Sequence, residues 1–67
     1  MMKIGLKGHG YDLTIEIASG STIRQALDKA EIHPSTVLVS HKDTVLPHST
    51  ILKSDVNLDL TIVSSGG

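Results

Sequence analysis

Apolar residues in this chain recur at every second position in three segments, and with the period of a helix in one. The alternating segments are residues 2–8, 12–18 and 56–63, where Ile, Leu, Val or Met side chains are separated by polar residues or glycine. A period of two is typical of a strand with one buried face. The helical stripe lies in residues 21–34, on Ile23, Ala26, Leu27 and Ala30. The pattern predicts an α+β domain with one helix.

Both ends of the predicted helix carry sequence signals. Thr22 and Gln25 have the spacing of a capping box, in which the Thr hydroxyl accepts from the backbone amide of Gln25 and the Gln side chain reaches back. Pro34 disfavours the helical conformation at His33, so we expect the helix to end just before Pro34. The face opposite the apolar stripe is charged and is expected to be solvated; it carries Arg24, Asp28, Lys29 and Glu31.

Turn residues separate the predicted strands. Residues 8–12, "GHGYD", have turn chemistry, so the first two strands are expected to form an antiparallel hairpin. Residues 36–40 and 44–47 predict two short strands around a tight turn. The last strand is expected to turn Val56, Leu58, Leu60 and Ile62 inward, and Asn57, Asp59, Thr61 and Val63 outward.

The order of the elements, ββαβ(β)β, predicts the fold. A long final strand after a single helix usually pairs in the centre of the sheet, beside the first strand. We therefore expect the β-grasp fold, a mixed sheet of four to five strands curled around one helix, formed by residues 1–63 and followed by a flexible tail, residues 64–67. The fold by itself says little about function.

Length and composition restrict the function classes. The chain of 67 residues can form one small domain, and without cysteine it has no disulfide framework and no thiolate metal site. No apolar run approaches the ~20 residues of a membrane span and the first residues do not form a signal peptide, so we expect a cytoplasmic protein without membrane contact. The net charge is −1 and Tyr11 is the only aromatic residue, which argues against direct binding of nucleic acid.

The titratable residues form no recognisable catalytic or metal-binding motif. The histidines are His9, His33, His41 and His48. Their spacing is not that of a zinc site, so we expect solvated loop histidines and no metal. A hydrolytic triad built on His41 and Asp43 would need a rigid pocket and an oxyanion hole, which so short a chain does not readily provide. The glycines of residues 5–10 precede a strand and not a helix, which argues against a phosphate-binding loop. The sequence thus predicts no catalytic residues and a protein that is not an enzyme.

The sequence finishes on Ser64, Ser65, Gly66 and Gly67. Paired glycines contribute nothing to a folded core, because glycine loses more conformational entropy on ordering than any other residue. A β-grasp element order that finishes on a diglycine resembles the ubiquitin-like and sulfur-carrier family. This family includes ubiquitin, the small subunit of molybdopterin synthase, the thiamine-pathway sulfur carrier and the small archaeal modifier proteins. The archaeal modifiers are the most similar, through residues 32–52 and 58–67; Ser64 and Ser65 stand where ubiquitin has basic residues.

The resemblance implies that the Gly67 carboxylate acts as an acyl donor. A carboxylate is a poor electrophile and needs activation, which a partner adenylating enzyme of the ubiquitin-activating type would supply with ATP, while this chain binds no cofactor. A tail without side chains can enter a narrow active site that excludes water, and residues 64–67 extend over roughly 13 Å at about 3.3 Å per residue. The activated Gly67 would become a thiocarboxylate or form an isopeptide bond with a lysine.

Partners follow from the same resemblance. Besides the activating enzyme, they would be target-protein lysines, or a sulfur-accepting biosynthetic or tRNA-thiolation enzyme, and the chain is expected to be a monomer. In the resembling proteins the sheet face beside the tail binds partners, and here it would carry Leu38, Thr61 and Val63, with Ser64 and Ser65 leading to the carboxylate. Sulfur delivery and protein conjugation share the same chemistry up to the adenylate, so both stay open.

Three other interpretations also remain. The chain could be a β-grasp module that binds partners noncovalently, or a sulfur-donating small subunit of a molybdopterin-synthase-type complex. Residues 64–67 could also be an ordinary flexible linker, since Ser and Gly are common in such segments.

Overall fold

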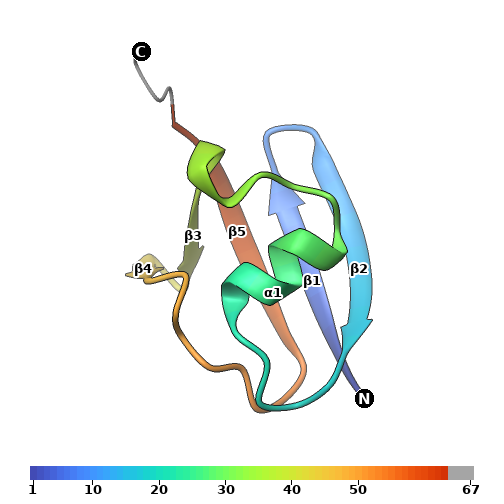
Figure 1. Ribbon diagram of the computed structural model, residues 1–67. Helices are drawn as coiled ribbons and strands as arrows, with labels where there is room; N and C mark the ends of the chain where they lie inside the picture. Colours follow the sequence, from blue (N-terminus) through green and yellow to red (C-terminus); the bar gives the residue numbers. More distant parts are fainter. Residues whose placement is uncertain (64–67) are drawn as a thin grey trace.

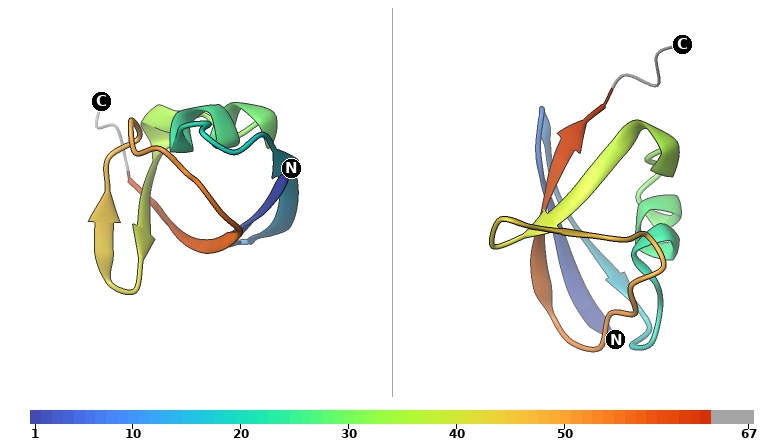
Figure 2. Two further views of the ribbon diagram at one scale, coloured as in Figure 1. Left: turned by 90° about the horizontal axis from the view of Figure 1, so that it is seen from below. Right: turned by 90° about the vertical axis from the view of Figure 1, so that its left-hand side faces the viewer.

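The computed structural model describes residues 1–63. Its elements are β1 (Met2–Gly8), β2 (Tyr11–Ile17), α1 (Ile23–Lys29), the 3₁₀ turn η1 (Pro34–Thr36), β3 (Val37–His41), β4 (Thr44–Leu46) and β5 (Val56–Ile62). The strands form one five-stranded sheet in the order β2-β1-β5-β3-β4. β1 and β5 are parallel, and the other neighbours are antiparallel. The sheet curls around α1, which covers one of its faces (Figures 1 and 2). The predicted β-grasp architecture, with the last strand beside the first, is confirmed.

Two tight turns set the register of the hairpins. His9 and Gly10 have φ of 47° and 88°, and Lys42 and Asp43 have φ of 51° and 65°. Positive φ at both central residues is the geometry of a type I′ turn, whose twist matches that of the flanking strands. The first turn pairs Gly8 with Tyr11, so Ile4 faces Ile15 and Leu6 faces Leu13 across the β1–β2 ladder.

The N-terminus of α1 is fully capped. The predicted capping box is present: the Gln25 amide donates to the Thr22 hydroxyl at 3.2 Å, and the Thr22 amide donates to the Gln25 side-chain carbonyl at 2.8 Å. The next amides of the first turn donate to the segment that follows β4, Ile23 to the Thr50 carbonyl and Arg24 to the His48 carbonyl, each at 3.0 Å. These bonds fix the helix against residues 48–52 and satisfy the amides that an isolated helix leaves free.

The C-terminus of α1 lies earlier than predicted. The helix ends at Lys29, not just before Pro34, because Glu31 adopts the left-handed conformation with φ of 62°. The Ile32 amide donates to the Leu27 carbonyl at 2.9 Å, and the Glu31 amide to that of Asp28 at 3.1 Å. This is a Schellman motif, in which the left-handed position is usually glycine. Ile32 consequently turns back against Leu27 and joins the core.

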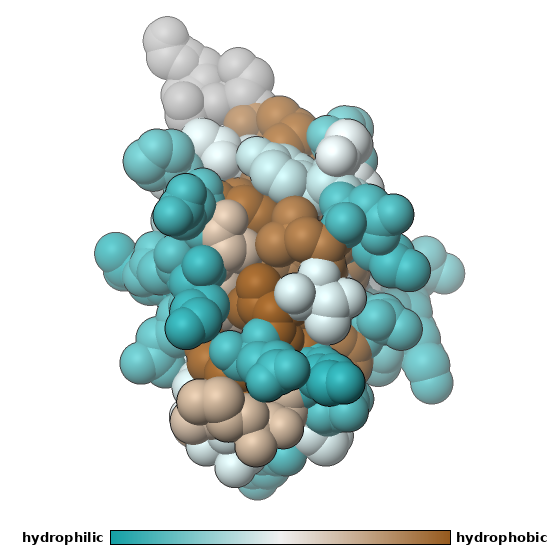
Figure 3. Space-filling model, turned by 90° about the vertical axis from the view of Figure 1, so that its right-hand side faces the viewer, coloured by the Kyte–Doolittle hydropathy of each residue, from teal (hydrophilic) through white to brown (hydrophobic). Residues whose placement is uncertain are grey.

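The core lies between α1 and the sheet. Its buried residues are Met2, Ile4, Leu6, Ile23, Ala26, Leu27, Ile32, Val37, Val39, Leu52, Leu58 and Leu60. The predicted inward residues of β1, the predicted helix and β5 that belong to this set are Met2, Ile4, Leu6, Ile23, Ala26, Leu27, Leu58 and Leu60. Ala30 and Val56, also predicted to face inward, are only half-buried and pack against the core. The apolar residues of β2 are only half-buried, because no strand lies beyond this edge of the sheet. Figure 3 shows this side of the molecule, where apolar surface runs between two polar borders.

The inward row of β5 ends earlier than predicted. Ile62, expected to face the core, is 44% exposed. β1 pairs with β5 only as far as Lys7 opposite Asp59, and β1 ends at Gly8. The last residues of β5 therefore have no β1 neighbour to cover them, although Ile62 still pairs with Val37 of β3.

Candidate partner-binding surface

Leu38 and Thr61 lie side by side on the outer face of the sheet, the face that points away from α1. They are register partners in the β3–β5 ladder. Val37 and Val39, the neighbours of Leu38 in the strand, are both buried, so alternation turns Leu38 outward. Leu38 is 42% exposed, and Thr61 is exposed as well. The predicted placement of this pair is confirmed.

Val63 differs from the expectation. It follows the end of β5, where its amide donates to the Thr36 carbonyl at 2.9 Å, and its side chain is half-buried and not fully exposed. The hydrogen bond holds the end of the described chain against η1. Val63 thus borders the Leu38–Thr61 pair without presenting a fully open side chain.

Val45 adds an apolar side chain that the sequence analysis missed. It pairs with Ser40, two residues along β3 from Leu38, and is 59% exposed. Leu46 beside it packs against the core, so alternation within residues 44–46 was the signal that could have identified Val45. Diagonal neighbours on one sheet face lie about 7–8 Å apart, close enough for one partner side chain to touch both. We name Leu38, Val45 and Thr61 the outer patch.

The rest of the outer face is mainly polar and charged. Alternation from the buried positions puts Lys3 and Lys7 of β1, Asp12 and Glu16 of β2, and Asp59 of β5 on this face. Lys7 lies between Asp12 and Asp59 in the register. The outer patch therefore lies at one end of the outer face, and the rest of that face is charged.

The histidines do not gather into a metal centre: the part of the chain that the structure describes has no group of three His, Asp or Glu residues able to hold an ion. His48 is not the solvated residue expected from the sequence. It is half-buried, and its Nε2–H donates to the Val37 carbonyl at 3.1 Å. His48 thereby joins the segment before β5 to the start of β3. With His33 and Arg24 it borders an open hollow of about 420 Å³.

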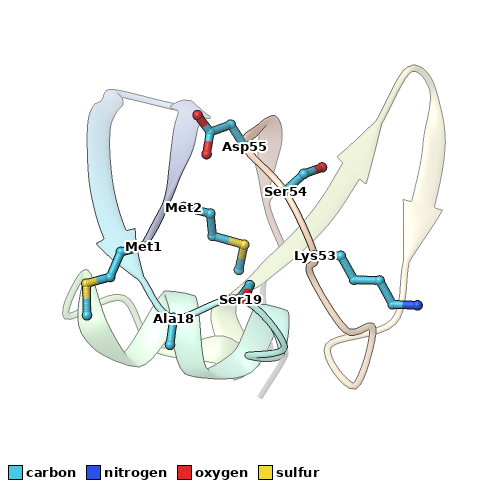
Figure 4. A pocket seen from close by; sticks show the side chains of 7 residues that line it. All are labelled: Met1, Met2, Ala18, Ser19, Lys53, Ser54 and Asp55. Atoms are coloured by element: carbon cyan, nitrogen blue, oxygen red, sulfur yellow. The ribbon is translucent and has the colours of Figure 1, made fainter.

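A larger open depression, about 660 Å³, lies at the other end of the molecule. Its lining residues are Met1, Met2, Ala18, Ser19, Lys53, Ser54 and Asp55. Figure 4 shows Met2 between the loop that carries Ala18 and Ser19 and the loop of residues 53–55, with the Lys53 side chain pointing away from the other lining residues. The Asp55 carboxylate accepts from the Lys3 amide at 2.8 Å, which ties this loop to β1. The depression holds no paired acid, base or nucleophile of the kind that catalysis requires.

Gly66 and Gly67, the residues predicted for activation, lie outside the described residues, as do Ser64 and Ser65. The structure does describe β5, the strand that precedes these residues in the chain. β5 runs between β1 and β3 and ends at the pole of the domain opposite the N-terminus (Figure 1).

No helix within residues 1–63 is long and apolar enough to cross a membrane.

No protein-family model and no curated protein matches the sequence. Among solved structures the chain is similar to a ubiquitin from Caldiarchaeum subterraneum, with a TM-score of 0.70 and 20% identity, over 98% of this chain and 98% of that one. The element order, the sheet topology and this similarity over the whole length show that the chain has the ubiquitin-like β-grasp fold.

Proposed function

We propose that this chain is a ubiquitin-like modifier or sulfur carrier whose working group is the Gly67 carboxylate. One observation carries the proposal: the central strand of a ubiquitin-like sheet, β5, leads within a few residues to Gly66-Gly67. Glycine has no side chain to contribute to a core, whereas a segment without side chains can enter a narrow enzyme channel.

The chemistry divides between two proteins. A carboxylate oxygen of Gly67 attacks the α-phosphorus of ATP in the active site of a partner adenylating enzyme, and pyrophosphate leaves. Hydrosulfide or the free amine of a lysine then attacks the acyl carbon of the adenylate; AMP leaves and a proton is released to solvent, which gives a thiocarboxylate or an isopeptide. The chain catalyses neither step and binds no cofactor; it supplies the acyl group. Because the reaction consumes ATP, we place it in the cytoplasm.

The outer patch, Val63, Ser64 and Ser65 form the proposed contact with the activating enzyme. A tail alone binds weakly, since ordering each backbone residue costs about 1–2 kcal/mol. Selection of this carrier over others must therefore come from the folded surface next to the tail. Leu38 and Val45 supply apolar area there, and they lie on the strands that continue the sheet beyond β5. We expect the carrier itself to be monomeric.

Mass spectrometry of the protein recovered from its own cells tests this function. An N-terminal affinity tag suits the purpose, because Met1 is 88% exposed and lies at the pole away from the end of β5 (Figure 1). A sulfur carrier would show sulfur in place of one carboxyl oxygen at Gly67. A modifier would leave residues 54–67 on target lysines after trypsin digestion, because Lys53 is the last basic residue. A free carboxylate under all growth conditions, with partners recovered only noncovalently, would contradict the proposal and favour a binding module.

A further inference from the structure

Three segments that are far apart in the sequence meet around one hollow on the α1 side of the sheet. The hollow has a volume of about 420 Å³ and is lined by Arg24 of α1, by His33, Pro34 and Ser35 at the start of η1, and by His48. The right-hand view of Figure 2 faces this side and shows the segment after β4 running from the sheet to the start of α1, below η1. Of these described lining residues, four have a polar side chain and none is acidic.

Hydrogen bonds hold the three segments together. The Arg24 amide donates to the His48 carbonyl, and the Ile23 amide to the Thr50 carbonyl, each at 3.0 Å. Because these first amides of α1 are already bonded, the hollow offers side chains to a ligand and not the helix terminus. The His48 ring also donates through Nε2–H to the carbonyl of Val37, the residue that follows η1, at 3.1 Å. The wall of the hollow is therefore fixed by the fold.

Arg24, His33 and Ser35 offer hydrogen-bond donors to the hollow. All three side chains are exposed, and none of them takes part in the side-chain hydrogen bonds within residues 1–63. Asp28 and Glu31, the acids closest in sequence to Arg24 and His33, do not line the hollow. A guanidinium is always charged, and its N–H groups match pairs of oxygens on a phosphate or a carboxylate. These donors therefore favour an anionic group.

His48 offers the opposite function, a hydrogen-bond acceptor. A carbonyl oxygen can only accept, so Nε2 of His48 carries the proton of the bond to Val37. In the neutral imidazole the other ring nitrogen, Nδ1, then has a lone pair that can accept a hydrogen bond. Nδ1 has no partner among the side-chain hydrogen bonds within residues 1–63. A ligand that fits the hollow should accordingly combine an anionic group with a nearby N–H group.

A phosphorylated residue within a peptide has both groups. Its phosphate has three acceptor oxygens and about 1.5–2 negative charges, and the adjoining backbone supplies amide donors. A carboxylate has only two oxygens and one charge for the three donor side chains. Inorganic phosphate lacks the amide. A nucleotide would find no side chain for its base to stack on, since none of the described lining residues is aromatic.

We propose that this hollow binds a phosphoserine or phosphothreonine of another protein. Arg24 pairs with two oxygens of the phosphate, His33 and Ser35 donate to its oxygens from the η1 side, and Nδ1 of His48 accepts from a backbone amide of the bound segment. The hollow lies on the α1 side of the sheet, whereas the outer patch lies on the opposite face. Its binding groups do not include residues 64–67, so the site is independent of the proposed carrier chemistry.

Titration of the whole chain with synthetic peptides, followed by NMR, tests this site. The probe is a blocked heptapeptide of glycine and alanine with phosphoserine at its centre. Its counterparts have glutamate or serine at the centre, and inorganic phosphate is titrated separately. A hydrogen bond to a charged group corresponds to about 10- to 150-fold in affinity and a neutral one to about fivefold. We expect the phosphoserine peptide to bind at least about tenfold more tightly than the glutamate peptide and about fivefold more tightly than inorganic phosphate.

Two matched variants separate the hollow from general charge attraction. Arg24→Gln and Lys29→Gln each remove one positive charge from an exposed position of α1, and of the two only Arg24 lines the hollow. Gln has nearly the helix propensity of Arg and Lys, so both variants should fold. We expect Arg24→Gln to weaken binding of the phosphoserine peptide at least about tenfold, and Lys29→Gln less than about twofold because exposed charges are screened by salt.

The ring nitrogens of His48 give a measurement on the unaltered chain. Because Nδ1 is the acceptor for a peptide amide in the proposed complex, its nitrogen resonance should move when the phosphoserine peptide binds. Inorganic phosphate has no amide and should leave the Nδ1 resonance nearly in place. The Nε2–H bond to Val37 is part of the fold, so we expect its signal to persist in both titrations.

Several results would overturn the inference. These are equal affinities for the phosphoserine and glutamate peptides, equal losses in the Arg24 and Lys29 variants, shifts centred on the outer patch, or no binding at about 1 mM peptide. Equal affinity for inorganic phosphate, with the same shift of His48 Nδ1, would assign the hollow to a free anion instead. Deletion of Gly66 and Gly67 should leave peptide binding unchanged, which keeps this test separate from that of the carrier function. Tighter peptide binding after the deletion would assign the hollow to the terminal carboxylate of the chain itself.

Discussion

The same substitution, Leu→Ala, can be made at a buried and at an exposed position of the sheet, Leu60 and Leu38. Leu60 lies on β5 with its side chain 2% exposed in the core, whereas Leu38 on β3 is 42% exposed on the outer face. Leu60→Ala removes three carbon groups worth about 0.8 kcal/mol each on burial and leaves a cavity, so we expect a loss of about 2–5 kcal/mol in the free energy of unfolding. Leu38→Ala loses only part of the free energy gained by burying the leucine side chain, and it leaves no enclosed cavity. We therefore expect a loss of about 1 kcal/mol in the free energy of unfolding.

Thermal unfolding followed by circular dichroism measures both variants. In a domain of this size 1 kcal/mol corresponds to about 4–8 °C, so Leu60→Ala should lower Tm by about 10–40 °C and Leu38→Ala by less than about 10 °C. Small domains are marginally stable, and Leu60→Ala could leave the chain unfolded at 37 °C. Equal losses for the two variants would refute the strand phases on which both the core and the outer patch depend.

Substitutions at three further places test the described geometry. Gly8→Ala should destabilise the domain by about 1–3 kcal/mol, because φ is 130° and a Cβ would collide with a β5 carbonyl, whereas Gly10→Ala meets no neighbour and should cost about 1 kcal/mol; equal denaturation midpoints would contradict this. Glu31→Gly should raise the unfolding free energy by about 0.5–1 kcal/mol in a urea titration, since the left-handed position of a Schellman motif suits glycine, and a lower midpoint would argue against that motif. Leu38→Asp or Val45→Asp should weaken binding to the activating enzyme about thirtyfold without unfolding the domain, with Glu31→Lys as control, and unchanged calorimetric affinities would remove the outer patch from the mechanism.

Local patterns predicted most of this fold because each pattern had a single physical cause. Alternation in residues 2–8 and 12–18 follows from one buried sheet face, and the capping box at Thr22 and Gln25 is a purely local hydrogen-bonding unit. The outward positions of Leu38 and Thr61 followed from the same alternation. Such features depend on neighbours in the sequence, which the sequence shows directly.

The features that were missed depend on residues far apart in the chain. The helix ends at Lys29 because the chain turns there, so that Ile32 packs in the core beside Leu27. Pro34 only sets the furthest point to which the helix could have extended. Ile62 is exposed because β1 stops at Gly8, a difference in strand length that no local pattern records.

Two side chains outside the long strands were missed for related reasons. His48 is held by the carbonyl of Val37, a contact that only the folded chain creates. Val45 sits in a strand too short for its alternation to stand out. The candidate site was therefore predicted in its strands and revised at its borders.

The central claim is that the Gly67 carboxylate is activated by adenylation. ATP–pyrophosphate exchange tests it directly, with an adenylating enzyme of the ubiquitin-activating type from the source organism and either the whole chain or a variant lacking Gly66 and Gly67. The deletion keeps all the buried residues of the described part of the chain, residues 1–63, so we expect both forms to unfold at the same temperature. We predict exchange with the whole chain and none with the truncated form. Equal exchange with both forms, or loss of the folded state on truncation, would contradict the claim.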